Sequence, residues 1–171
     1  MTIQAIMQRA VSLLGAAVGE PNATGRRQRL LAALDSGIGE LARCFPLQAR
    51  CRVTIENGKG PIPAQVLSPR GLYKEGRRVP LQIEEGFLRG ADGSYTLVYY
   101  RNPPVPSEMG EQERLPYPAD LLRALPFYCA ALLVMGEDPA LYQQLMEQYN
   151  TKLSAALGHR PVATVESRGS L

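Results

Sequence analysis

The 171-residue chain has no tryptophan and only three phenylalanines, so we expect an aliphatic core with tyrosines at its margins. A chain of this length can bury a core without disulfides or metals, most naturally as one domain with room for a subdomain. Its net charge of +3 permits contact with an acidic partner but is far from a DNA-binding signature.

Histidine is almost absent as well. His159 is the one histidine, which excludes most histidine-based metal sites and argues against Ser-His-Asp or Cys-His catalysis. Residues 58–60 lack the spacing of a phosphate-binding loop and are expected to form a turn. The adjacent Glu84 and Glu85 should face opposite sides of a strand and so should not converge on one substrate. We therefore expect no catalytic residue, no metal and no cofactor.

Cysteine pairs and long apolar runs are also missing. Cys44, Cys51 and Cys129 form no CxxC motif, and we expect three reduced thiols in a cytosol. Polar residues interrupt the apolar ones over residues 3–14, so no secretory signal is expected. Because no run of about 18 apolar residues exists, no membrane span is expected either.

Apolar residues at helical spacing predict a first helix over about residues 3–18 and a second from near Thr24 to Pro46, which stops it. Gly37 and Gly39 lie inside the second helix, where each costs roughly 1 kcal/mol against alanine. We therefore expect close packing against a neighbouring helix at these two glycines.

Residues 49–101 alternate between apolar and polar side chains, with Gly and Pro breaks. This pattern predicts four to six short strands in a small antiparallel sheet or sandwich. Residues 91–93 predict a hairpin turn into the last strand. In that strand Tyr95 and Tyr99 share one face and Tyr100 takes the other, and we favour cross-strand packing over a sugar- or peptide-binding platform.

Two further helices are predicted after the strands. Pro118 suits a first helical position, and Pro126 should kink or split the apolar helix around it. Asp138 is a good N-cap and Pro139 a good first residue for the last helix. The residues after Gly158 are expected to be extended or disordered until a partner binds them. The loop before these helices is expected to carry solvated charge at Glu108, Glu111 and Glu113.

The expected fold class is α+β: a bundle of about four helices, with a small antiparallel β-lobe inserted between two helical pairs and an extended C-terminal tail. The expected parts are an N-terminal helical pair (1–48), a β-rich insert (49–104), a C-terminal helical pair that completes the bundle (105–157) and an extended C-terminal arm (158–171).

Two small clusters of arginines stand out in the chain, Arg26-Arg27-Arg29 and Arg77-Arg78. The first cluster lies in the first turns of the second helix, the wrong end for the helix dipole, so we expect it to have another partner. The simplest interpretation of both clusters is a solvated face, and the alternative is contact with an acidic protein surface or passing DNA. Aromatic residues are not interleaved with these arginines in the sequence, so stacking with a single strand is not expected.

The stretch from Tyr95 to Leu157 carries a further pattern. A strand end precedes a Leu-Pro pair and an apolar helix, and the next helix repeats tyrosine and leucine on one face. The residues are Tyr99-Tyr100-Arg101-Asn102-Pro103-Pro104, Leu115, Pro116, Leu121, Leu122, Tyr142, Leu145, Tyr149 and Leu153. This order resembles the head–tail connector (adaptor) proteins of tailed bacteriophages.

The resemblance implies a structural virion protein of the neck, without enzymatic activity and without a membrane, assembled in the host cytoplasm. Such adaptors form a homo-oligomeric ring, commonly a dodecamer, beneath the portal protein. They complete the head, extend the channel through which the genomic DNA passes without sequence-specific contact, and give the tail or a stopper protein a docking surface.

The resemblance also suggests where this chain would bind its partners. The tails of such adaptors often reach into the portal, so the expected docking residues are His159, Arg160, Pro161, Val162, Val165, Arg168 and Leu171. The expected subunit- or DNA-facing cluster is Arg26, Arg27 and Arg29.

Two alternative functions stay open on the sequence. One is another structural component of a phage neck or tail, such as a stopper, a tail terminator or a baseplate part. The other is a cytosolic module whose β-lobe binds a peptide or sugar through Tyr95 and Tyr99.

Overall fold

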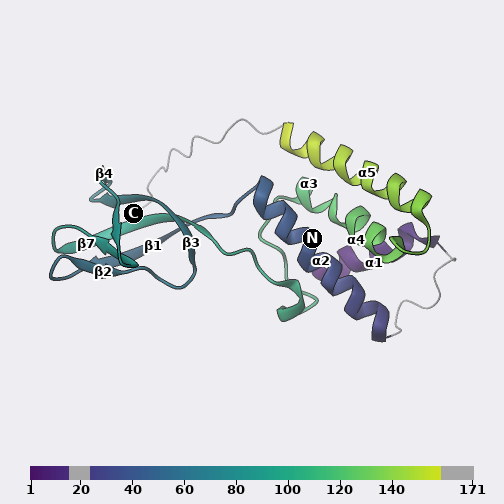
Figure 1. Cartoon of the computed structure of the whole chain (residues 1–171), viewed down its shortest axis with the longest axis horizontal. Helices are drawn as coiled ribbons and strands as arrows, with labels where there is room; N and C mark the ends of the chain where they lie inside the picture. The colour runs from purple at the N-terminus through teal and green to yellow at the C-terminus, as the bar shows by residue number, and fades with distance from the viewer. Residues whose placement is uncertain (16–23, 159–171) are drawn as a thin grey trace. The chain divides into compact units, whose positions relative to one another are not determined.

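The computed structural model describes residues 1–15 and 24–158 and shows the expected α+β fold (Figure 1). The chain divides into two compact units, Met1–Gly39 with Val105–Leu171 and Glu40–Pro104. We call them the helical unit and the β unit. The expected docking residues of the C-terminal arm, from His159 to Leu171, lie outside the described residues.

The helical unit is built from both ends of the chain. Its elements are α1 (Ile3–Leu13), most of α2 (Thr24–Cys44), a 3-10 turn η2 (Pro106–Glu108), α3 (Ala119–Leu122), α4 (Leu125–Val134) and α5 (Pro139–Gly158). The predicted first helix was too long: α1 ends at Leu13, and Gly15 takes a left-handed φ of +63°. A glycine adopts this conformation without steric cost, which makes it suited to a helix end.

Pro126, Asp138 and Pro139 act on the C-terminal helices as predicted, whereas Pro118 is the N-cap of α3 and not its first residue. Pro126 lies within the first two positions of α4, and the helix expected to contain it is split into α3 and α4. Asp138 Oδ1 accepts a hydrogen bond from the Leu141 amide at 3.0 Å, which caps the start of α5 at Pro139.

Helix α4 is the centre of the helical unit. It is apolar on all sides, and α1, α3 and α5 pack against it. Figure 1 shows α5 running beside it. A helix that is apolar all round must be buried on all sides. Its buried residues are Leu125, Pro126, Cys129, Ala130, Ala131, Leu133 and Val134.

The β unit contains two antiparallel sheets. One has the strand order β1-β7-β3-β4, from β1 (Gln48–Ile55), β7 (Gly93–Arg101), β3 (Val66–Lys74) and β4 (Arg77–Val79). The other has the order β2-β6-β5, from β2 (Lys59–Pro61), β6 (Phe87–Arg89) and β5 (Gln82–Glu84). The predicted hairpin at residues 91–93 is wrong, because β6 and β7 belong to different sheets and do not pair.

Three two-residue turns close the actual hairpins of the β unit. They are Asn57-Gly58, Glu75-Gly76 and Glu85-Gly86, and all six residues have φ between +49° and +80°. Two successive residues with positive φ define the type I′ turn, whose twist matches that of the strands it joins. The first turn is closed by a single bridge between Glu56 and Lys59. The other two set the register of β3 with β4 and of β5 with β6.

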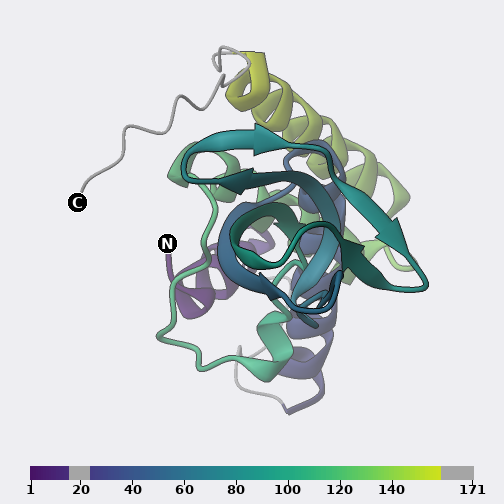
Figure 2. The ribbon, with the colours of Figure 1, turned by 90° about the vertical axis from the view of Figure 1, so that its left-hand side faces the viewer.

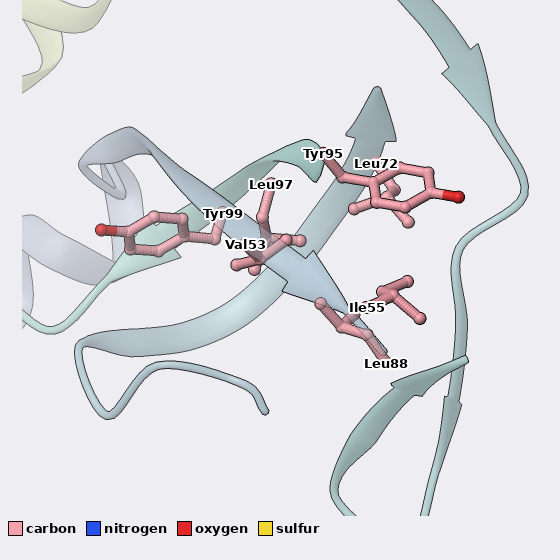
Figure 3. Close-up of a cluster of buried hydrophobic side chains, with 7 residues drawn as sticks. All are labelled: Val53, Ile55, Leu72, Leu88, Tyr95, Leu97 and Tyr99. Carbon is pink, nitrogen blue, oxygen red and sulfur yellow. The ribbon is translucent and has the colours of Figure 1, made fainter. Parts of the chain in front are cut away.

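The core of the β unit lies on one face of the larger sheet (Figure 3). Figure 2 shows the ribbon of this unit curling round on itself. Leu88 of the smaller sheet is fully buried in the cluster, so the two sheets share this core. Its members are Val53, Ile55, Leu72, Leu88, Tyr95, Leu97 and Tyr99.

Only one of the two glycines in α2 makes the expected close contact. A Cβ atom at Gly37 would lie 2.9 Å from Leu125 Cδ2 and 3.1 Å from Tyr128 Cδ1, so α2 approaches α4 closely there. A Cβ at Gly39 would meet nothing within 4 Å. The prediction of close packing is therefore correct for Gly37 and wrong for Gly39.

These two positions provide a matched pair of alanine substitutions. We expect Gly39→Ala to raise the free energy of unfolding by up to about 1 kcal/mol through helix propensity. We expect Gly37→Ala to lower it by about 1–3 kcal/mol, since the new methyl must displace the fully buried Leu125. Urea unfolding followed by the helical circular dichroism signal measures both. Equal stabilisation by the two substitutions would show that α2 and α4 are not in close contact.

Candidate functional site

The tyrosines considered as a binding platform lie mainly inside the protein. Tyr95 and Tyr99 are only 6 % and 5 % exposed, and both rings belong to the core in Figure 3. The Tyr95 hydroxyl donates a hydrogen bond to the Ala91 carbonyl oxygen at 2.7 Å. Tyr100, on the opposite face of β7, is half-buried. Because their ring faces are covered, Tyr95 and Tyr99 cannot stack on a sugar or a peptide.

The first arginine cluster has partners within the helical unit. The Arg27 Nε atom lies 2.6 Å from Glu111 Oε1. Arg29 donates a hydrogen bond of 2.8 Å to the Leu133 carbonyl oxygen in the last turn of α4. A cation at this end is favourable for the α4 dipole, which offsets the unfavourable position of the same arginine at the start of α2. Arg26 is half-buried.

The sequence suggested that the loop before α3 carries only solvated charge, but the loop also makes specific hydrogen bonds. The carbonyl oxygens of Glu111 and Glu113 accept hydrogen bonds from the amides of Gln4 and Ile3, at 2.9 and 3.2 Å. These amides lie in the first turn of α1 and have no partner within the helix. The side chain of Glu113 accepts a hydrogen bond from the Gly110 amide. The loop therefore holds the start of α1.

Glu84 and Glu85 both lie near Arg89, so the expectation that they face opposite sides of a strand is wrong. Arg89 Nε lies 2.9 Å from Glu84 Oε2, and Arg89 Nη2 lies 3.8 Å from Glu85 Oε2. The expectation failed because Glu85 lies in a turn with positive φ rather than in the strand. The group they share is a cation, so this is an ion-pair cluster at a hairpin end.

The small polar cavity of the helical unit does not form a small-molecule site. A cavity of about 210 Å³ lies between α1, α2 and Glu111, below the roughly 300–1,000 Å³ of typical ligand pockets. Its charged groups, Arg27 and Glu111, already pair with each other. Among the described residues, no three His, Cys, Asp or Glu side chains are grouped so that they could hold a metal ion.

Sequence patterns missed an apolar surface of the helical unit. A shallow depression between α2 and α4 is lined by five apolar residues and one charged residue, and Met135 is 58 % exposed. The lining residues are Arg29, Ala32, Ala33, Leu132, Leu133 and Met135. On α5, Tyr142, Met146, Leu153 and Leu157 follow helical spacing and are half-buried, whereas Leu145, Tyr149 and Ala156 are buried. The sequence showed that α5 carries a periodic apolar stripe. It did not show which residues of the stripe face the core.

No protein-family model matches this chain, and no curated protein matches it. In the described part of the chain, no helix has the length and apolar character needed to cross a membrane.

The three cysteines are free thiols in very different environments. Cys44 is exposed and Cys51 is half-buried, whereas Cys129 is buried in α4. Burial raises the pKa of the Cys129 thiol to about 12, and burial also raises the pKa of Cys51. The thiolate is the reactive form, so burial suppresses the reactivity of Cys129 at pH 8 even if reagent reaches it.

We therefore expect thiol labelling at pH 8 to follow the order Cys44, Cys51, Cys129. Iodoacetamide treatment of the native protein, read by peptide mass spectrometry, should modify Cys44 first and leave Cys129 unmodified. In urea, where the burial of Cys129 is lost, all three should react at similar rates. Rapid labelling of native Cys129 would contradict its place in the core of the helical unit.

Proposed function

We propose that this protein is a head–tail adaptor of a tailed bacteriophage, a structural ring subunit between the portal and the tail. The observation that carries the proposal is the division of the chain. A helical unit is assembled from both chain ends, and a continuous segment, Glu40–Pro104, forms a separate compact β unit. This layout fits the adaptor pattern that the sequence resembles from Tyr95 to Leu157. In the ring, the protein acts by holding its partners together and not by catalysis.

Ring assembly requires a surface on each helical unit that a neighbouring copy can cover. A ring uses head-to-tail interfaces, in which two different surfaces of the same chain meet. The helical unit has two candidates for such a pair: the depression that contains Met135, and the stripe of Tyr142, Met146, Leu153 and Leu157 on α5. Both are partly exposed; the stripe is apolar, and the depression is apolar apart from Arg29. Such surfaces suit burial on assembly.

The partners follow from this position in the particle. They are further copies of the chain in a ring of about twelve by analogy with adaptors, the portal protein on one side and a tail or stopper protein on the other. Residues 158–171 are the proposed arm that docks on the portal. The genomic DNA passes through the ring.

A role as a β-lobe module that binds through Tyr95 and Tyr99 has less support, because both rings are buried. Another structural position in the neck or tail, such as a stopper or a tail terminator, would use the same kind of apolar interface. The location of the protein in the particle distinguishes these positions from the adaptor.

Electron microscopy of particles produced from the genome that encodes this chain tests the proposal. We expect the protein in purified virions, as a ring in direct contact with the portal. Its absence from virions would refute a structural role. A position away from the portal would refute the adaptor and favour a terminator or baseplate part.

A pair of substitutions on α5 tests the interface in the same particles. Met146→Glu places a charge in the apolar stripe, and we expect it to abolish ring assembly and yield particles without attached tails. Gln144→Glu adds the same charge at an exposed position of the same helix and should assemble normally. Circular dichroism of both purified variants checks that each is folded. Normal assembly of a folded Met146→Glu variant would exclude the α5 stripe as an interface.

A further inference from the structure

The face of the larger sheet that points away from the core of the β unit carries four arginines and two tyrosines. In β1, Val53 and Ile55 are buried in the core while Arg50 and Arg52 are exposed, so the two arginines lie on the other face. The strand register extends this face to Tyr100, Tyr73 and Arg78 of the other three strands. Arg70 lies at an irregularity of β3 and is assigned to this face by its contact with the Tyr100 ring. We call it the basic sheet face and define it by Arg50, Arg52, Arg70, Tyr73, Arg78 and Tyr100.

The register places arginines on both sides of a less polar centre. Arg50 and Arg52 of β1 lie opposite Val98 and Thr96 of the neighbouring β7. Arg78, on the far strand β4, lies opposite Tyr73 of β3. With strands about 4.8 Å apart, the arginines of β1 and β4 are separated by about 14 Å across the sheet. The arginines therefore lie on both outer strands of the sheet, whereas a single row of solvated charge would follow one strand.

The charges of the basic sheet face are not neutralised within the described part of the chain. There, no carboxylate forms an ion pair with Arg50, Arg52, Arg70 or Arg78. The strand residues that alternate onto this face include no Asp or Glu. The segment 40–104 has ten Lys or Arg against six Asp or Glu, a net charge of +4. Four like charges on one surface favour an anionic partner.

The two tyrosines are arranged for stacking. The Arg70 guanidinium carbon lies 5.0 Å from the centre of the Tyr100 ring, so the cation covers one face of that ring. Arg70 itself is exposed, and a planar guanidinium can carry a further flat group. A Cβ atom at Gly71 would lie 3.1 Å from Tyr73 Cε2, which shows that the ring of Tyr73 lies over this glycine. Because Gly71 has no side chain, the Tyr73 ring can occupy the space above it.

Each anionic partner would use these groups differently. An acidic protein surface or a DNA duplex would use the arginines, but neither needs aromatic rings between them. A single strand uses both, because its phosphates pair with cations while its unstacked bases stack on aromatic side chains and guanidinium planes. The alternation of arginine and tyrosine therefore favours a single strand. The sequence concealed this arrangement, because its aromatic and basic residues meet only through the strand register.

We propose that the basic sheet face binds single-stranded nucleic acid. Arg50, Arg52 and Arg78 contact phosphates, while bases stack on Tyr73 and on the Arg70–Tyr100 pair. This interaction needs no ring and no portal, so it can hold or fail independently of the adaptor function.

Fluorescence anisotropy of the full chain with a labelled oligothymidylate of about 12 nucleotides tests the proposal. We expect binding that weakens as salt is raised. Arg52→Gln or Arg78→Gln should lower the affinity and reduce the slope of log K against log salt by about 0.7 for each phosphate that the variant no longer neutralises. Tyr73→Leu should weaken binding about 5- to 150-fold, the effect of removing one stacked base.

Arg77→Gln is the matched control for Arg78→Gln. Arg77 is the neighbouring residue of the same strand and pairs with Lys74, so it lies on the opposite face of the sheet. Arg77→Gln removes the same charge as Arg78→Gln but should leave the affinity for the oligonucleotide nearly unchanged. An equal loss with Arg77→Gln would mean that only the overall charge matters, which overturns the proposal.

Three other outcomes overturn it. They are no binding at low salt, equal binding of polyglutamate of matched charge, and equal binding of a duplex together with an unchanged affinity of a folded Tyr73→Leu variant. The second would indicate an acidic protein partner and the third a surface for phosphates alone. Circular dichroism establishes which variants are folded, and the exposed Arg52 and Arg78 provide the test if Tyr73→Leu unfolds.

Discussion

The helical unit depends on the hydrogen bonds between the first turn of α1 and the segment at residues 110–114. The amides of Ile3 and Gln4 find their acceptors in Glu113 and Glu111, and the side chain of Glu111 pairs with Arg27 of α2. Amides at a helix start need partners from outside the helix. Here those partners come from beyond the β unit in the sequence. These hydrogen bonds, together with the packing of α1 against α4, join two distant parts of the chain into one unit.

Local sequence signals predicted most of the helices and few details of the sheets. Pro126 and Asp138 act within one helical turn, so their effects could be predicted without knowledge of the fold. The turns at Glu75-Gly76 and Glu85-Gly86 were missed because glutamate is an unusual residue at positive φ. The error at residues 91–93 arose because strand pairing depends on segments far apart in the sequence. Element types were therefore predictable, whereas pairings were not.

The same distinction applies to the candidate sites. The partners of Arg27 and Arg29 lie more than eighty residues away in the sequence, and only the misplaced charge at the start of α2 indicated that they exist. The sequence showed Arg77 and Arg78 as one cluster, whereas the strand places them on opposite faces. Tyr95 and Tyr99 were correctly favoured as packing residues, since the alternation of a strand shows which residues share a face. Which of the two faces is buried depends on how the whole sheet packs, which a single strand does not show.

The two ends of the chain form one cooperative helical unit. Native-state hydrogen exchange in increasing urea tests it most directly, because it measures the free energy at which each segment opens. We expect the amides of Met7 and Ala10 in α1 to open at the same free energy as those of Cys129 and Leu133 in α4. If the α1 amides exchange at a much lower free energy while α4 stays protected, the claim is contradicted.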